Sequence, residues 1–135
     1  MLKCYRLIGR VPMECPIEAF GEWFETADRG VALTDTRIYA VSTVFLGLDH
    51  NYSMRGPPIL FETMVFERAD CEREDAPLRE EMGKRMVDFS ESLSIMRRYA
   101  TWGEAEEGHR RIVSEVLRIE IAAAHALDAL VNRHA

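Results

Sequence analysis

Hydrophobic positions follow two periods along this chain, a two-residue period typical of strands and a three-to-four-residue period typical of helices. The two-residue period runs over residues 3–8 and 11–15, and a glycine opens the two residues between them. This arrangement predicts a β-hairpin with a type II′ turn. In that register Cys4 faces Cys15, and the missing N–H of Pro12 points away from the partner strand. We therefore expect residues 11–15 to form an edge of the sheet.

Three more segments have the composition or the alternation of strands. Residues 31–34 and 38–48 predict a second hairpin, because 38–48 is rich in β-branched and aromatic residues. Residues 59–67 predict its partner strand. Both faces of this strand are largely apolar, so we expect other elements to cover both. Residues 92–99 alternate again and predict a further strand.

Two segments have a helical period. Residues 16–27 begin with a proline and carry one apolar stripe, which predicts a short amphipathic helix with its aromatic residues in the core. Thr101 and Glu104 form a capping-box pattern before a second stripe that continues over 102–133. Such a helix is about 45 Å long, whereas a domain of this size is about 35–40 Å across. It therefore either breaks near residues 118–122 or overhangs and packs on a second copy of the chain, and we favour the homodimer.

Together these elements predict an α+β fold in a single domain over residues 1–135. We expect an antiparallel sheet of about 4–6 strands, a short helix in the N-terminal half and a long C-terminal helix packed on the sheet. The chain has 135 residues, which suits one hydrophobic core, and 47% of them are hydrophobic. Two segments stand apart: a charged excursion over 68–90, with a short helix expected over 77–85, and the helical tail over 102–133.

The charge is moderately acidic, with 17 Lys and Arg against 23 Asp and Glu and a formal net charge of -6. This balance argues against nonspecific binding of nucleic acid, which needs clustered positive charge. No segment approaches the roughly 18 apolar residues of a membrane helix, and the first residues lack the pattern of a secretion signal. We expect a cytoplasmic protein that does not bind membranes.

Cysteine and histidine positions predict neither a disulfide framework nor a metal site. The three cysteines are too few and too scattered for a framework, and they lack C-x-x-C spacing. The four histidines are not paired on one helix face. A glycine-rich phosphate loop is also missing, so we expect no cofactor. The histidines are His50, His109, His125 and His134.

The best polar cluster follows the second predicted hairpin. Asp49 beside His50 could orient the imidazole as a general base, and Glu62 in the partner strand could add a second carboxylate. Tyr52 and Arg55 lie in the same loop and are candidate binding residues. No activated nucleophile accompanies them. In the alternative interpretation, the loop residues satisfy backbone groups, His50 packs under the loop and Glu62 binds a neighbouring arginine.

Four strings of this sequence resemble a family of small uncharacterised phage and prophage proteins. They are VSTVFLGLDHNY at 41–52, GPPILFETMVF at 56–66, RYATWGEAEEGH at 98–109 and WFETADR at 23–29. The resemblance implies a phage or prophage origin, and hence a host-cell cytoplasm, but the family has no assigned activity. The chain departs from the family pattern in the longer charged stretch over 68–90 and in the extended tail after Val113.

The charged excursion carries carboxylates that are candidate binding residues for a partner protein. An acidic surface can occupy the nucleic-acid site of another protein, as small acidic phage inhibitors of host defence do. Arginines and a lysine dilute this cluster, so a solvated surface is the alternative interpretation. The carboxylates are Glu72, Glu74, Asp75, Glu80 and Glu81.

The leading hypothesis is a phage or prophage accessory protein that acts without catalysis by binding another protein, with an anti-CRISPR-like inhibitor of a host-defence complex as the most concrete case. It depends on the missing catalytic constellation, the acidic excursion and the long helix. Two alternatives stay open. One is a small-ligand binder or enzyme that uses the loop Asp49–Arg55, and the other is a structural phage component.

Overall fold

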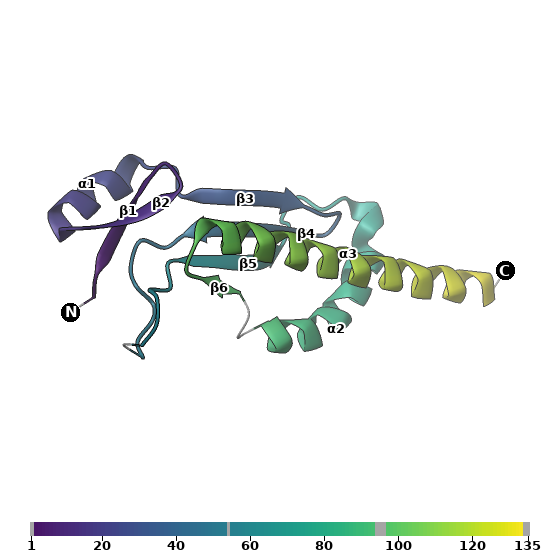
Figure 1. The fold of residues 1–135 in the computed structure, drawn as a ribbon. Helices are drawn as coiled ribbons and strands as arrows, with labels where there is room; N and C mark the ends of the chain where they lie inside the picture. Colours follow the sequence, from purple (N-terminus) through teal and green to yellow (C-terminus); the bar gives the residue numbers. More distant parts are fainter. Residues whose placement is uncertain (1, 54, 94–96, 134–135) are drawn as a thin grey trace.

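The computed structural model of this chain describes residues 2–53, 55–93 and 97–133. It confirms the α+β fold, with a two-stranded and a four-stranded antiparallel sheet, a short helix and a long C-terminal helix (Figure 1). The elements are β1 (Cys4–Ile8), β2 (Val11–Cys15), α1 (Ile17–Thr26), β3 (Gly30–Asp35), β4 (Tyr39–Phe45), β5 (Phe61–Glu67), the 3-10 helix η1 (Arg73–Asp75), α2 (Ala76–Leu93), β6 (Arg98–Tyr99) and α3 (Trp102–Arg133).

The first hairpin has the predicted register, with Cys4 opposite Cys15. The other side of β1 bonds to the segment that follows β4: the N–H of Tyr5 donates to the carbonyl of Gly47 at 2.7 Å, and the N–H of Asp49 donates to that of Lys3 at 3.2 Å. Because β1 is paired on both sides, β2 is the edge strand, as predicted.

The four-stranded sheet has the order β3-β4-β5-β6. Helix α3 lies across one face of it, and α2 runs alongside α3 (Figure 1). Strand β4 alternates strictly, and its buried residues Val41, Thr43 and Phe45 face α3. On β5 the corresponding inward residues are Phe61 and Thr63, which are also buried. The expectation that both faces of β5 are covered was wrong, because Met64 and Phe66 lie on the opposite, exposed face of the sheet.

The strand predicted over 92–99 was largely wrong. Helix α2 continues to Leu93, well past the predicted end of the helix at residue 85, and β6 contains only Arg98 and Tyr99. Residues 94–96 lie outside the described part of the chain. The helix is long because a stripe spaced by four residues packs against α3, and short alternation after it imitates a strand. The stripe comprises Leu78, Met82 and Met86, all buried.

Helix α1 packs less deeply than predicted and contains no buried residue. The Trp23 ring meets Phe45 edge-on, with centroids 5.7 Å apart. Phe24, by contrast, is exposed, and the guanidinium of Arg29 lies 4.0 Å from its ring centroid. The helix lies at one end of the molecule, so only one side of it contacts the rest of the chain (Figure 1).

Helix α3 is continuous over 32 residues, or about 48 Å. Thr101 caps its first turn, since its hydroxyl accepts the Glu104 N–H at 3.1 Å. The last buried residue of the helix is Ala123, and the remaining turns project beyond the sheet (Figure 1). Of the two predicted alternatives, the structure has the overhang and not the break.

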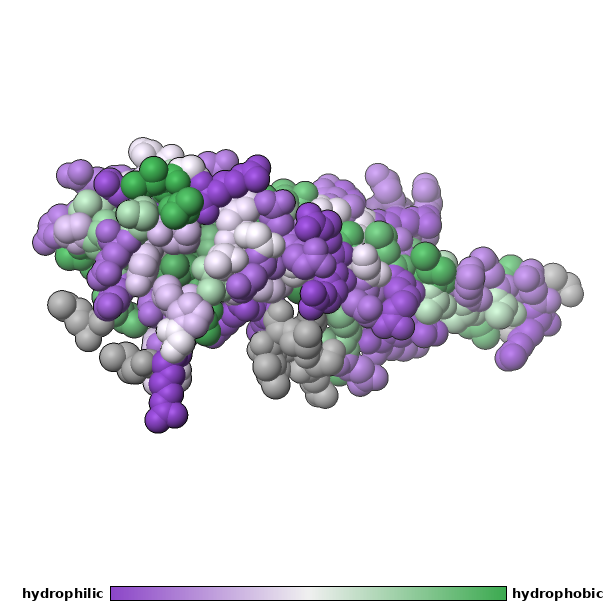
Figure 2. All heavy atoms as spheres, in the orientation of Figure 1, coloured by the Kyte–Doolittle hydropathy of each residue, from purple (hydrophilic) through white to green (hydrophobic). Residues whose placement is uncertain are grey.

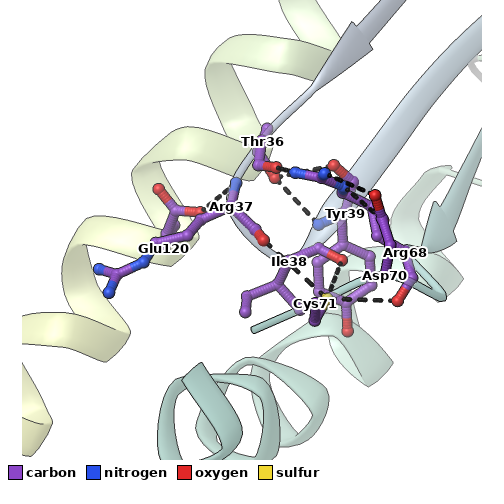
Figure 3. Close-up of polar contacts among 8 residues, drawn as sticks. All are labelled: Thr36, Arg37, Ile38, Tyr39, Arg68, Asp70, Cys71 and Glu120. Carbon is purple, nitrogen blue, oxygen red and sulfur yellow. Dashed lines mark hydrogen bonds and ion pairs between the residues drawn. The ribbon is translucent and has the colours of Figure 1, made fainter. Parts of the chain in front are cut away.

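A polar corner connects the β3–β4 turn to the charged excursion and to α3 (Figure 3). The guanidinium of Arg68 donates to the carbonyl of Thr36 at 2.7 Å. The thiol of Cys71 lies 3.2 Å from the carbonyl of Arg68. On the other side of the turn, the N–H of Arg37 donates to the Glu120 carboxylate at 3.1 Å. These bonds fix the start of the excursion against the sheet.

Candidate functional site

The core consists of two apolar clusters separated by a polar layer. One cluster includes Val41, Ile112 and Val116, and the other includes Phe45 and Phe61. Between these clusters, each strand of the four-stranded sheet and helix α3 contribute one polar side chain. These polar residues are Thr34 on β3, Thr43 on β4, Thr63 on β5, Tyr99 on β6 and His109 on α3.

These five residues form one hydrogen-bonded chain, here called the polar chain. Thr34 Oγ1 lies 2.8 Å from His109 Nε2, and His109 Nδ1 lies 2.7 Å from Thr43 Oγ1. Thr43 Oγ1 lies 2.6 Å from Thr63 Oγ1. Thr63 Oγ1 in turn donates to the hydroxyl oxygen of Tyr99 at 3.2 Å. Because every link is of hydrogen-bonding length, this buried polar layer need not carry the cost of unpaired groups.

The direction of the last bond fixes the others, because each hydroxyl has one hydrogen to donate. Thr63 donates to Tyr99, so Thr43 must donate to Thr63. The hydrogen between Thr43 and His109 then comes from Nδ1 of the imidazole, and in a neutral ring Nε2 accepts from Thr34. A neutral His109 is therefore the Nδ1–H tautomer, and the hydroxyl hydrogen of Tyr99 is left to donate elsewhere.

The electrostatics of His109 agree with a neutral ring. Its burial lowers the pKa below the usual value for histidine, and the nearby positive charge of Arg110 lowers it further. Both partners of the ring in the polar chain are uncharged threonine hydroxyls, so no carboxylate stabilises an imidazolium there. At neutral pH this histidine bonds as a neutral donor and acceptor.

Sequence reasoning did not find the polar chain. The histidine spacing predicts no metal site at His109, and Thr43 is only one residue of a predicted strand. Four of the five members lie within three of the strings that carry the family resemblance, which meet in space at this layer. An available indication was the single polar residue at an inward position of each strand, opposite a histidine on the buried stripe of the helix.

In the predicted catalytic loop, the polar side chains bond to backbone groups of the loop and its flanking residues. Asp49 Oδ1 accepts the N–H groups of Asn51 at 2.8 Å and Ile59 at 3.0 Å. His50 Nδ1 lies 2.8 Å from the carbonyl of Leu48. These bonds agree with the alternative interpretation, in which the loop residues satisfy backbone groups.

The other predicted loop residues are not brought together with His50. Glu62 lies on the exposed face of β5 and pairs with Arg98 at 3.4 Å. Tyr52 is exposed and, with Asp49, lines a cleft of about 480 Å³; neither His50 nor Glu62 is among the described residues that line it. Arg55 is exposed, and its carbonyl accepts from the Asn51 side chain at 2.6 Å.

The acidic excursion divides into paired and exposed carboxylates. Asp75 is buried and pairs with Arg37 at 2.6 Å. Glu81 is partly buried and pairs with Arg85 at 3.2 Å. The remaining three predicted carboxylates are exposed and lie on η1, on α2 or just before them: Glu72, Glu74 and Glu80.

The face of the four-stranded sheet opposite α3, here called the open face, is an exposed apolar surface. Across the sheet, Leu33 pairs with Ser42 and Ser42 with Met64, while Phe66 pairs with Ala40. Leu33, Met64 and Phe66 are 70%, 45% and 44% exposed. Apolar groups gathered in this way on a rigid sheet are typical of a docking surface.

Comparison with family models, with curated proteins and with solved structures gives no match to this chain. Among the described residues, no helix combines the length and the apolar character needed to cross a membrane. Over the same residues, no three or more His, Cys, Asp or Glu side chains gather in a way that could hold a metal ion.

Proposed function

We propose that this chain is a phage or prophage accessory protein that binds another protein without catalysis, and that it docks through the open face. The observation that carries the proposal is the exposure of Leu33, Met64 and Phe66 on β3 and β5, the two strands that flank β4. Strands hold these side chains at fixed spacing, so little conformational entropy is lost when a partner covers them. Protein interfaces commonly have an apolar centre of this kind inside a polar rim.

Charges beside the open face indicate what the partner presents. Asp35 lies at one end of the open face, and the ion pair Glu62–Arg98 lies on this face along β5. The chain as a whole carries a formal net charge of -6. We infer a partner with an apolar patch beside basic residues, and a nucleic-acid-binding complex of host defence is the class that fits this description.

The test uses a photo-reactive phenylalanine analogue placed at Met64 and, as a control, at Val87, which is 59% exposed on α2. Cross-linking in infected host cells is expected to yield one protein from position 64 and none from position 87. With that protein purified, M64K/F66K is expected to weaken binding about 30-fold or more, and V87K to leave it unchanged. Equal cross-linking from both positions, or unchanged affinity of M64K/F66K, would contradict the proposal.

We further propose that the chain forms a homodimer through the projecting end of α3. Hydrophobic residues lie among charged ones along this end (Figure 2), and Ile121, Leu130 and Val131 are 56%, 49% and 68% exposed. Light scattering behind a sizing column measures the mass directly. A value of twice 15.5 kDa, returning to 15.5 kDa in L130E/V131E, is expected. A wild-type mass of 15.5 kDa at micromolar concentration would contradict the dimer.

A further inference from the structure

Helices α2 and α3 enclose a cleft of about 500 Å³, a volume in the usual range for small-molecule sites. The cleft is separate from the open face, since it opens between the two helices that cover the other side of the sheet. Its lining combines an apolar floor with a charged rim. The floor consists of Phe89, Tyr99, Gly108, Ile112 and Ile119, and the rim consists of Arg85, Asp88, Arg111, Glu115 and Arg118.

Gly108 lines the cleft at the point where α3 meets the ring of Tyr99 on β6. A side chain at this position would overlap the ring of Tyr99, so only glycine lets the ring lie directly against the helix. The edge of the Tyr99 ring therefore reaches the cleft, although the residue is only 9% exposed. A flat aromatic surface next to Ile112 and Ile119 suits an apolar body.

Each arginine of the rim has a carboxylate partner. Arg85 pairs with Glu81, Arg118 with Glu115 and Arg111 with Glu107. Arg111 is the least committed of the three, because its ion pair with Glu107 is 3.9 Å long and the same carboxylate already binds Arg110 at 3.0 Å. A guanidinium has several N–H donors, so one carboxylate partner does not saturate it.

The polar chain places one more donor at this cleft. Thr63 donates to the hydroxyl oxygen of Tyr99, which leaves the hydroxyl hydrogen of Tyr99 without an acceptor in the chain of bonds described above. Tyr99 lines the cleft together with Arg111. A neutral phenol and a guanidinium are both donors to an anionic oxygen.

We propose that the cleft binds a small amphipathic carboxylate. Its apolar body lies on Ile112, Ile119 and Phe89, and its carboxylate accepts from the Arg111 guanidinium and the Tyr99 hydroxyl. Arg118 and Arg85 lie on the rim as well, each in an ion pair with a carboxylate. This site goes beyond the proposed docking function, because it uses the opposite side of the sheet and does not depend on a partner protein.

The experiment follows fluorescence of the amphipathic anion 8-anilinonaphthalene-1-sulfonate on the full chain, with decanoate and neutral decanol as competitors. We expect saturable binding at one site, displaced by decanoate and not by decanol. R111Q/R118Q is expected to raise the dissociation constant about tenfold, because it removes two charged donors. The matched control R6Q/R73Q neutralises two exposed arginines that do not line the cleft, and it is expected to leave binding unchanged.

Three results would overturn the proposal. Equal displacement by decanol would mean that the site does not select an anion. Equal effects of R111Q/R118Q and R6Q/R73Q would mean that the rim charges do not contact the probe. Loss of probe binding in M64K/F66K, with binding retained in R111Q/R118Q, would place the probe on the open face. Thermal unfolding of each variant confirms that it is folded, so that a loss of binding is not a loss of structure.

Discussion

Replacing Gly108 with alanine is expected to lower the free energy of unfolding by about 1–3 kcal/mol. In the interior of most helices this change stabilises the protein, because alanine is favoured over glycine by up to about 1 kcal/mol. Here the new methyl group would overlap the ring and the hydroxyl of Tyr99. The ring is buried and its oxygen accepts from Thr63, so it cannot move away without breaking the end of the polar chain.

The matched control is Gly83→Ala in the middle of α2, where an added methyl group meets no atom within 4 Å. The two substitutions are chemically identical and are expected to change stability in opposite directions. Chemical denaturation of wild type and both variants measures the difference. A stabilised Gly108→Ala variant would show that the contact between Tyr99 and α3 is looser than described.

A double-mutant cycle identifies the cause. Tyr99→Leu removes the ring that obstructs the methyl group, so Gly108→Ala is expected to cost much less in the Tyr99→Leu background than in wild type. The coupling energy between the two sites should then be about 1 kcal/mol or more. Its sign should be such that the double variant loses less stability than the sum of the two single variants. Zero coupling would place the strain of Gly108→Ala elsewhere.

The sequence predicted local pairing well because local pairing depends on local chemistry. A glycine at the start of a two-residue turn set the register of the first hairpin, and the proline in its second strand identified the edge. The stripe of α3 was correct as far as Ala123, the last residue of that helix to be buried. Each of these depends on residues that are close together in the chain.

Long-range arrangement was not accessible in the same way. Whether an apolar strand face is covered depends on where helices pack, and β5 exposes Met64 although its pattern resembles that of a central strand. The helix over the excursion was predicted too short, since its length depends on packing of Met86 against α3. A pattern records that a residue is apolar, not which element covers it.

The polar chain illustrates the same difference at the candidate site. Thr43, Thr63 and His109 come from three separate regions of the sequence, up to 66 residues apart. Each alone is unremarkable, because threonine is common in strands and a lone histidine has many roles. The strand register brings them together: Thr43 pairs directly with Thr63 in the sheet, and His109 of α3 bonds to Thr43. The loop at Asp49, in contrast, attracted attention because its polar residues are adjacent, and their bonds are mainly local.

Acidification is expected to destabilise the fold through His109, beginning near pH 6.5. Burial, with a further contribution from Arg110, lowers the pKa of His109 in the folded chain below its unfolded value. The unfolded chain therefore binds a proton at a pH where the folded chain does not. The contribution of neutral His109 to stability is fully present above the pKa of the unfolded chain, about 6.5. It is lost as the pH falls from there toward the lower pKa of His109 in the folded chain, where the loss ends. One such group gives a slope of at most about 1.4 kcal/mol per pH unit.

The measurement compares the free energy of unfolding of wild type and His109→Gln between about pH 7.5 and about pH 5.5, which brackets the ordinary histidine pKa. Other titrating groups are common to both proteins, so their effects cancel in the comparison, and the wild type is expected to lose more stability. If the variant does not fold, NMR titration of the His109 ring in the wild type gives the same information. A His109 ring that titrates at or above pH 6.5 would contradict this prediction.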